Sequence, residues 1–146
     1  MNRRYAFLSL LAIAATSACA QTSLQQSHTD GNVPPQESFA EFLNRDLLAF
    51  FQAGAASSAT SVQFHLLRNG PTQSGVSFPK FFVWVKVFSS ATVLEEGAAS
   101  VAAINRTHFE ITNFQSAQQI NARPSVVSSI FPSVLVPIIL ERAGTK

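Results

Sequence analysis

Two histidines and one glutamate come closest to a catalytic or metal-binding set. His65 falls in an alternating segment at 60–68, and His108 shares one face of a second alternating segment, 107–112, with Glu110. If these strands were neighbours, the three side chains would form an acid–base cluster or part of a zinc site, which needs three or four ligands. Nothing in the spacing enforces this. We therefore expect solvent-exposed strand residues, and assign no catalytic residue and no metal ligand.

A second candidate is one face of the segment 76–88, which carries lysines and aromatic rings at alternate positions. Aromatic faces stack on sugars, bases or acyl chains, and lysines hold anions. Three arrangements are open. The C-terminal helices cover this face with the lysine heads at its rim, which we expect; the face forms a homodimer through the sheet; or it binds a ligand. The candidate ligand face comprises Lys80, Phe82, Trp84, Lys86 and Phe88.

Familiar catalytic and cofactor motifs are missing from the sequence. The loop at 69–75 lacks the Gly-Lys-Ser/Thr of a phosphate-binding loop, and no Gly-x-Ser-x-Gly nucleophile motif occurs. We therefore expect no cofactor. One further carboxylate, Asp46, borders the apolar stripe of a predicted helix, where it is either partly buried or, as we expect, in water at the margin.

The charge balance argues against a nucleic-acid partner. Ten basic residues include Arg3 and Arg4 near the N-terminus, which leaves eight against eight acidic residues, with no basic cluster. Only 12% of residues are charged, about half the usual ~25%. So few charges indicate a surface of small polar residues, and burial of part of that surface against a partner or a membrane is a further option.

The first twenty residues have the three parts of a bacterial secretory leader. A positive start, Arg3 and Arg4, precedes an apolar run at 5–15 and a small-residue cleavage site at 18–20. A membrane span would need about 20 apolar residues. The sequence thus predicts a leader over 1–20 and a periplasmic or secreted protein, with a flexible polar linker at 21–37 and one domain at 38–146.

Cys19 is the only cysteine and offers an alternative location. The segment 16–19 resembles a lipidation motif, with Thr16 where that motif usually has Leu. Lipidation would make an outer-membrane lipoprotein anchored at Cys19. Cleavage after Ala20 would instead leave a cysteine-free chain, whose stability depends on its core without a disulfide.

A helix is predicted over 38–53. Ser38 and Glu41 form a capping box, Glu41 and Arg45 form an i,i+4 ion pair, and Gly54 ends the helix. Apolar residues recur at helical spacing. They are Phe39, Phe42, Leu43, Leu47, Phe50 and Phe51.

Alternation then predicts strands at 60–68, 76–88, 98–104 and 107–112, with turns near 69–75, 95–97 and 105–106. Pro79 lacks an amide hydrogen and should lie at an edge or bulge. From Ser116, which forms a second capping box with Gln119, the pattern predicts short helices at 116–122, 125–131 and 133–143, separated by prolines. The uncharged stretch 124–140 is expected to be buried, with peripheral envelope association as the alternative.

The order of elements predicts an α+β fold: an N-terminal amphipathic helix, an antiparallel meander of three or four strands, and short C-terminal helices. This order resembles cystatin-like and NTF2-like rolls in its opening helix followed by a meander. No residue motif accompanies the resemblance, so it concerns architecture alone. The predicted function is a non-catalytic envelope or periplasmic module that binds a protein or a small apolar ligand; a small enzyme using His65, His108 and Glu110 is the alternative.

Overall fold

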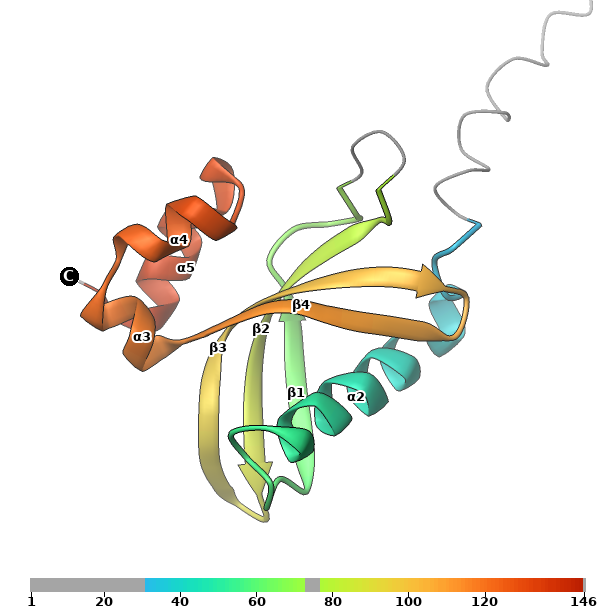
Figure 1. Ribbon diagram of the computed structural model, residues 1–146, viewed down its shortest axis with the longest axis horizontal. Helices are drawn as coiled ribbons and strands as arrows, with labels where there is room; N and C mark the ends of the chain where they lie inside the picture. The colour runs from blue at the N-terminus through green and yellow to red at the C-terminus, as the bar shows by residue number, and fades with distance from the viewer. Residues whose placement is uncertain (1–30, 73–76, 146) are drawn as a thin grey trace, which may run out of the picture.

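The computed structural model describes residues 31–72 and 77–145. The predicted leader, Cys19, most of the linker and part of the 69–75 loop lie outside these residues. One long helix is followed by four strands and short C-terminal helices, which confirms the predicted α+β fold (Figure 1). The elements are α2 (Gln36–Ala53), β1 (Ser61–Leu66), β2 (Lys80–Ser89), β3 (Thr92–Asn105), β4 (His108–Ser116), α3 (Ala117–Ala122), α4 (Ser125–Ile130), η1 (Ser133–Leu135) and α5 (Val136–Ala143).

The four strands form an antiparallel meander in the order β1-β2-β3-β4. β2 begins at Lys80, directly after Pro79, because proline has no amide hydrogen to donate to the ladder. The turn predicted at 95–97 is wrong: these residues lie inside β3, and the chain reverses at Ser90, which has a φ of 55°. Gly97 serves a different need, since a Cβ there would lie 2.1 Å from the carbonyl oxygen of Gln115 on β4.

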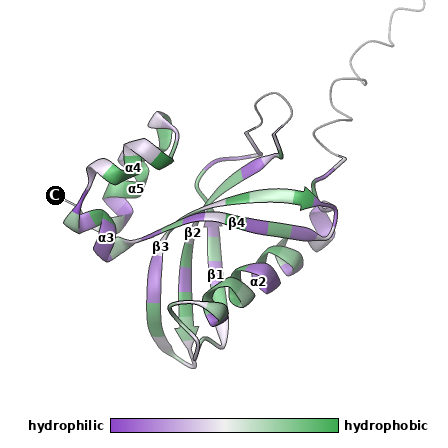
Figure 2. Cartoon of the chain, in the orientation of Figure 1, coloured by the Kyte–Doolittle hydropathy of each residue, from purple (hydrophilic) through white to green (hydrophobic). Residues whose placement is uncertain are grey.

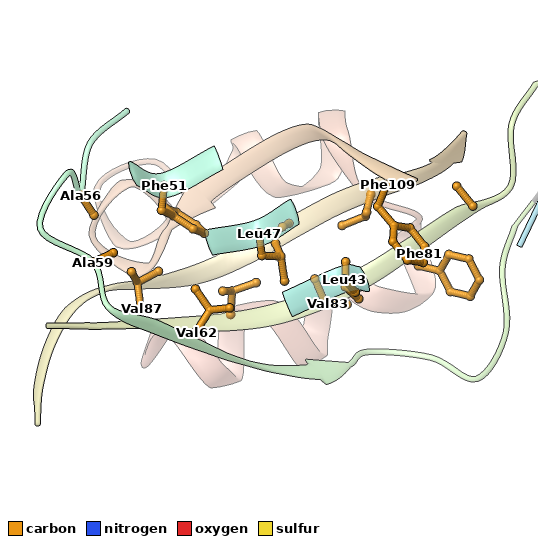
Figure 3. Close-up of a cluster of buried hydrophobic side chains, with 14 residues drawn as sticks. Leu43, Leu47, Phe51, Ala56, Ala59, Val62, Phe81, Val83, Val87 and Phe109 are labelled. Carbon is orange, nitrogen blue, oxygen red and sulfur yellow. The ribbon is translucent and has the colours of Figure 1, made fainter. Parts of the chain in front are cut away.

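α2 covers one face of the sheet. It starts at Gln36, with Pro35 at the N-cap, so the capping box predicted at Ser38 is wrong. The Ser38 hydroxyl instead donates back to the Pro35 carbonyl, at 3.3 Å. Figure 2 shows apolar and polar residues alternating along α2, and its apolar stripe packs on side chains of all four strands. Figure 3 shows the resulting cluster, which includes Leu43, Leu47, Phe51, Val83 and Phe109.

The C-terminal helices cover the opposite face. Ile120, Val127 and Ile139 pack with Phe82 and Trp84 of β2 in a second apolar cluster. The capping box predicted at Ser116 is confirmed, with the Ser116 hydroxyl accepting from the Gln119 amide and the Gln119 side chain accepting from the Ser116 amide. β2 is therefore covered on both faces, whereas β1 and β4 form the two edges of the sheet.

Candidate functional site

The structure does not bring His65, His108 and Glu110 together. His65 lies on β1, and the other two lie on β4, at the opposite edge of the sheet. Three strand spacings separate these edges, about 14 Å. His65 is paired with Trp84, whereas His108 lies beside the β3–β4 turn. Within residues 31–72 and 77–145, no three of His, Cys, Asp and Glu are grouped closely enough to hold a metal ion.

His108 instead lies beside Asp46 of α2, with 3.3 Å between its Nδ1 and the carboxylate. The Asp46 carboxylate also accepts from Arg45 Nε at 2.8 Å, from Arg45 Nη2 at 3.1 Å, and from the Phe109 amide at 2.7 Å. Only 9% of Asp46 is exposed, so the expectation that it lies in water is wrong. The aspartate is buried because these donors replace the water that a carboxylate otherwise requires.

This polar cluster ties α2 to the turn between β3 and β4. The Arg45 guanidinium donates both to Asp46 and to the Thr107 carbonyl, and the hydrogen bond with Asp46 raises the pKa of Arg45 above its ordinary value. Both Asp46 oxygens are occupied by donors of the same chain. The arrangement is that of a structural anchor, since a general base needs a free oxygen directed at a substrate.

The candidate ligand face on β2 is divided between the interior and the surface. Phe82 and Trp84 are buried beneath the C-terminal helices, with 3% of Trp84 exposed. Lys80 is exposed, Phe88 is half-buried, and Lys86 pairs with Glu96 at 3.5 Å. The two central rings thus contact side chains of this chain, which is the arrangement expected if the helices cover the face.

A different hollow lies on the α2 side of the sheet, where β3 and β4 run past the end of the helix. It measures about 570 Å³, within the ~300–1,000 Å³ common for small-ligand sites. The last turn of α2 and the following loop form one wall, and β4 and the start of α3 form most of the remainder. Its lining residues are Phe50, Phe51, Ala53, Gly54, Ala55, Glu95, Ile111, Thr112, Asn113, Phe114, Ser116 and Gln119.

Three phenyl rings make the apolar side of this hollow. The Phe51 ring lies edge-on to both Phe50 and Phe114, with centroid distances of 5.2 Å and 4.8 Å. Phe51 is buried in the core, whereas 40% of Phe50 is exposed. A buried ring therefore holds two partly accessible rings in place at the site.

The charges at the hollow have one sign. Among the described residues that line it, Glu95 is the only ionisable one, and no hydrogen bond or ion pair joins its carboxylate to another described residue. The C-terminal end of α2, which carries partial negative charge, forms the adjacent wall and has no basic residue in its last turn. The hollow thus combines aromatic rings with an uncompensated carboxylate.

Sequence reasoning missed this site because it placed Glu95 in a turn and Phe50 simply in a helical stripe. The signal available was the alternation of Glu95 and Glu96 within a strand: Glu95 lies on the α2 side and Glu96 on the opposite side, beside Lys86. The curvature that brings β4 and α3 near the end of α2 depends on pairing distant in sequence.

Comparison with protein-family models, with curated proteins and with solved structures gives no match to this chain. None of the helices in the described part of the chain is both long and apolar enough to cross a membrane.

Proposed function

We propose that this protein is a non-catalytic binding module whose hollow beside the end of α2 holds a small apolar molecule bearing one positive charge. The observation that carries the proposal is the position of Glu95, an unpaired carboxylate at a site lined by Phe50, Phe51 and Phe114. The proposal needs no catalytic group, and the histidines lie elsewhere.

The apolar part of the ligand follows from the lining. Phe50, Ile111 and Phe114 present hydrocarbon surface to a hollow that is open to solvent, so a ligand that covers them removes apolar area from water. Each Å² so covered contributes roughly 25 cal/mol. An alkyl chain or a small ring fits this volume, and the side-chain amides of Asn113 and Gln119 supply hydrogen-bonding groups.

The positive charge follows from the electrostatics. An ammonium group is attracted to a carboxylate and to the faces of aromatic rings, and each phenyl contact contributes about 0.5–2 kcal/mol. The end of α2 adds attraction of the same sign. An anionic ligand would meet Glu95 and the helix end, and no cation among the described lining residues would offset them.

The test compares three octyl compounds that differ in head group: octyltrimethylammonium, octyl sulfate and octyl glucoside. Their affinities for the protein are measured by isothermal titration calorimetry below their micelle concentrations. We expect the cationic compound to bind about tenfold more tightly than the anionic one, a difference of about 1.4 kcal/mol. Equal affinities, or no binding by the cationic compound, would refute the proposal.

Two adjacent glutamates give a matched pair of variants. Glu95→Gln should abolish the preference for the cationic head group, whereas Glu96→Gln removes the same charge from the other face and should leave the preference intact. Phe50→Ala should weaken all three compounds together, since it removes apolar surface without changing charge. An equal loss in both glutamine variants would place binding elsewhere.

The cellular location of the protein is part of the same proposal. The leader pattern over 1–20 supports export, so the ligand would be met in the periplasm or outside the cell. Mass spectrometry of the mature protein tests this: a chain that begins at Gln21 supports export without an anchor, and one that begins at a lipidated Cys19 supports the lipoprotein alternative. A chain retaining Met1 in the cytosol contradicts both.

A further inference from the structure

The outer edge of β1 offers unpaired backbone groups. The Leu67 amide donates to the Phe82 carbonyl of β2, and the antiparallel register continues from this pair to Ser61 and Phe88. Because alternate residues of an antiparallel strand bond to the same neighbour, the amides and carbonyls of Val62, Phe64 and Leu66 point away from β2. Among the described residues none hydrogen-bonds to these groups.

Two hollows accompany this edge on the side of α2, of about 390 Å³ and 300 Å³. Asn44 and Val62 line both, so the hollows form one groove between α2 and β1. The Asn44 Oδ1 atom is buried and has no hydrogen-bond partner in the described chain. A buried acceptor without a partner costs about 1–3 kcal/mol, which indicates a part of the fold whose polar groups are not all satisfied in one isolated copy.

The residues of β1 fit a second copy of the same strand. From Val62 to Leu66 the sequence reads apolar, polar, apolar, polar, apolar, with Phe64 at its centre. The stretch 57–67 contains no charged residue and no proline, the two devices that commonly protect edge strands. Antiparallel self-pairing therefore meets neither charge repulsion nor a missing donor.

We infer that β1 is a self-association edge, at which a second copy of this chain adds its own β1 in antiparallel register centred on Phe64. The residues whose backbone groups point away from β2 then form hydrogen-bonded pairs between the two copies. In this register Val62 lies opposite Leu66 of the second copy. Leu66, which is 40% exposed in one copy, lies beside the groove of the other. On the opposite face Gln63 lies opposite His65 of the second copy, so both faces match in polarity.

Sedimentation velocity over a range of concentrations tests this with protein purified from cells that express the full chain. We expect a monomer–dimer equilibrium. The double variant Gln63→Lys/His65→Lys places like charges directly opposite one another across the two-fold axis, which destabilises strand pairing. It should weaken dimerisation by about tenfold or more. Both side chains are exposed, but position 63 lies opposite Lys86 of the same copy, so circular dichroism must show that the variant remains folded.

A charge-swapped partner makes the test specific. Gln63→Glu/His65→Glu should also be monomeric alone, and mixing it with the lysine variant should restore dimers as a heterodimer. Gln118→Lys/Ala122→Lys adds the same charge at exposed positions of α3 and should leave dimerisation unchanged. A wild-type chain that is monomeric at every concentration, or a lysine variant that dimerises as well as wild type, overturns the inference and leaves the edge to an extended segment of another protein.

Discussion

The two faces of the sheet are covered in different ways. α2 is a single helix of 18 residues that is fixed to the β3–β4 turn by the Asp46 cluster as well as by apolar packing. The C-terminal cover consists of short helices that are joined to one another by side-chain hydrogen bonds, such as that from Asn121 to the Ala143 carbonyl. Within the described structure, this cover is held to the strands by apolar contacts and, at the point where β4 passes into α3, by the capping box between Ser116 and Gln119. We therefore expect the C-terminal cover to open locally at a lower free-energy cost than α2, which the Asp46 cluster anchors.

The largest effect should come from Gly97, where β4 crosses close to β3 on its way to the C-terminal cover. In Gly97→Ala the new Cβ would lie 2.1 Å from the Gln115 carbonyl oxygen and 2.7 Å from the Ser116 Cα, so backbone atoms must move. We expect a loss of at least about 3 kcal/mol in the free energy of unfolding, measured by urea denaturation. Gly54→Ala, whose Cβ has ordinary contacts, is the control. Equal stability of the two variants would contradict the close approach.

A matched pair of core truncations compares the covers directly. Leu47 of α2 and Ile139 of α5 are both fully buried, and Leu47→Ala and Ile139→Ala should each cost about 2–5 kcal/mol. Trp84, the only tryptophan, lies under the C-terminal cover and reports on it. In urea, Ile139→Ala should show the change in Trp84 fluorescence before the loss of helical circular dichroism, whereas in Leu47→Ala the two should coincide. Coincident transitions in both variants would show that the covers unfold together.

Removal of the anchor charge should have an intermediate effect. In Asp46→Asn the Phe109 amide and Arg45 lose their charged acceptor, and hydrogen bonds to charged groups contribute about 1.5–3 kcal/mol. We expect a destabilisation in this range by thermal denaturation. Glu37→Gln removes an exposed carboxylate from the first turn of the same helix and should change stability by less than about 0.5 kcal/mol. An Asp46→Asn protein as stable as wild type would mean that α2 is held by packing alone.

The smallest effect is expected at the capping box of the C-terminal cover. Ser116→Ala removes the acceptor for the Gln119 amide and should cost about 1 kcal/mol, measured by urea denaturation. Ser125→Ala, in a helix whose N-cap is Pro124 and lacks a side-chain cap, serves as the control and should cost less. If Ser125→Ala cost more, the capping box would not be what starts the C-terminal cover.

Local signals in the sequence predict the elements well. The stripe of Leu43, Leu47 and Phe51 and the capping box at Ser116 each depend on residues close in sequence, and the structure places them as expected. The start of α2 was wrong by two residues because Pro35, with its fixed φ, supplies the N-cap in place of Ser38. The turn predicted at 95–97 was wrong because of Gly97. In a sequence, a glycine that allows two strands to approach closely cannot be distinguished from a glycine in a turn.

The candidate site depends on relations that local patterns do not contain. Asp46 meets the Phe109 amide across 63 residues, and its burial could not be predicted without that partner. The same holds for Glu95 and Phe50, which line one hollow because β3 and β4 run past the end of α2. His65 on β1 and His108 on β4 lie far apart because the strand order of a meander leaves these two strands at opposite edges of the sheet.

The position of β2 has a consequence for how the molecule exchanges hydrogen with its solvent. From Phe81 to Val85 every residue is buried, and a bonded strand lies on either side. Each of these amides exchanges only when the one strand that accepts its hydrogen bond, β1 or β3, separates from β2, so the slowest exchange among them should approach the free energy of global unfolding. This one strand provides an internal gauge of total stability, against which every partial opening of the chain can be ranked.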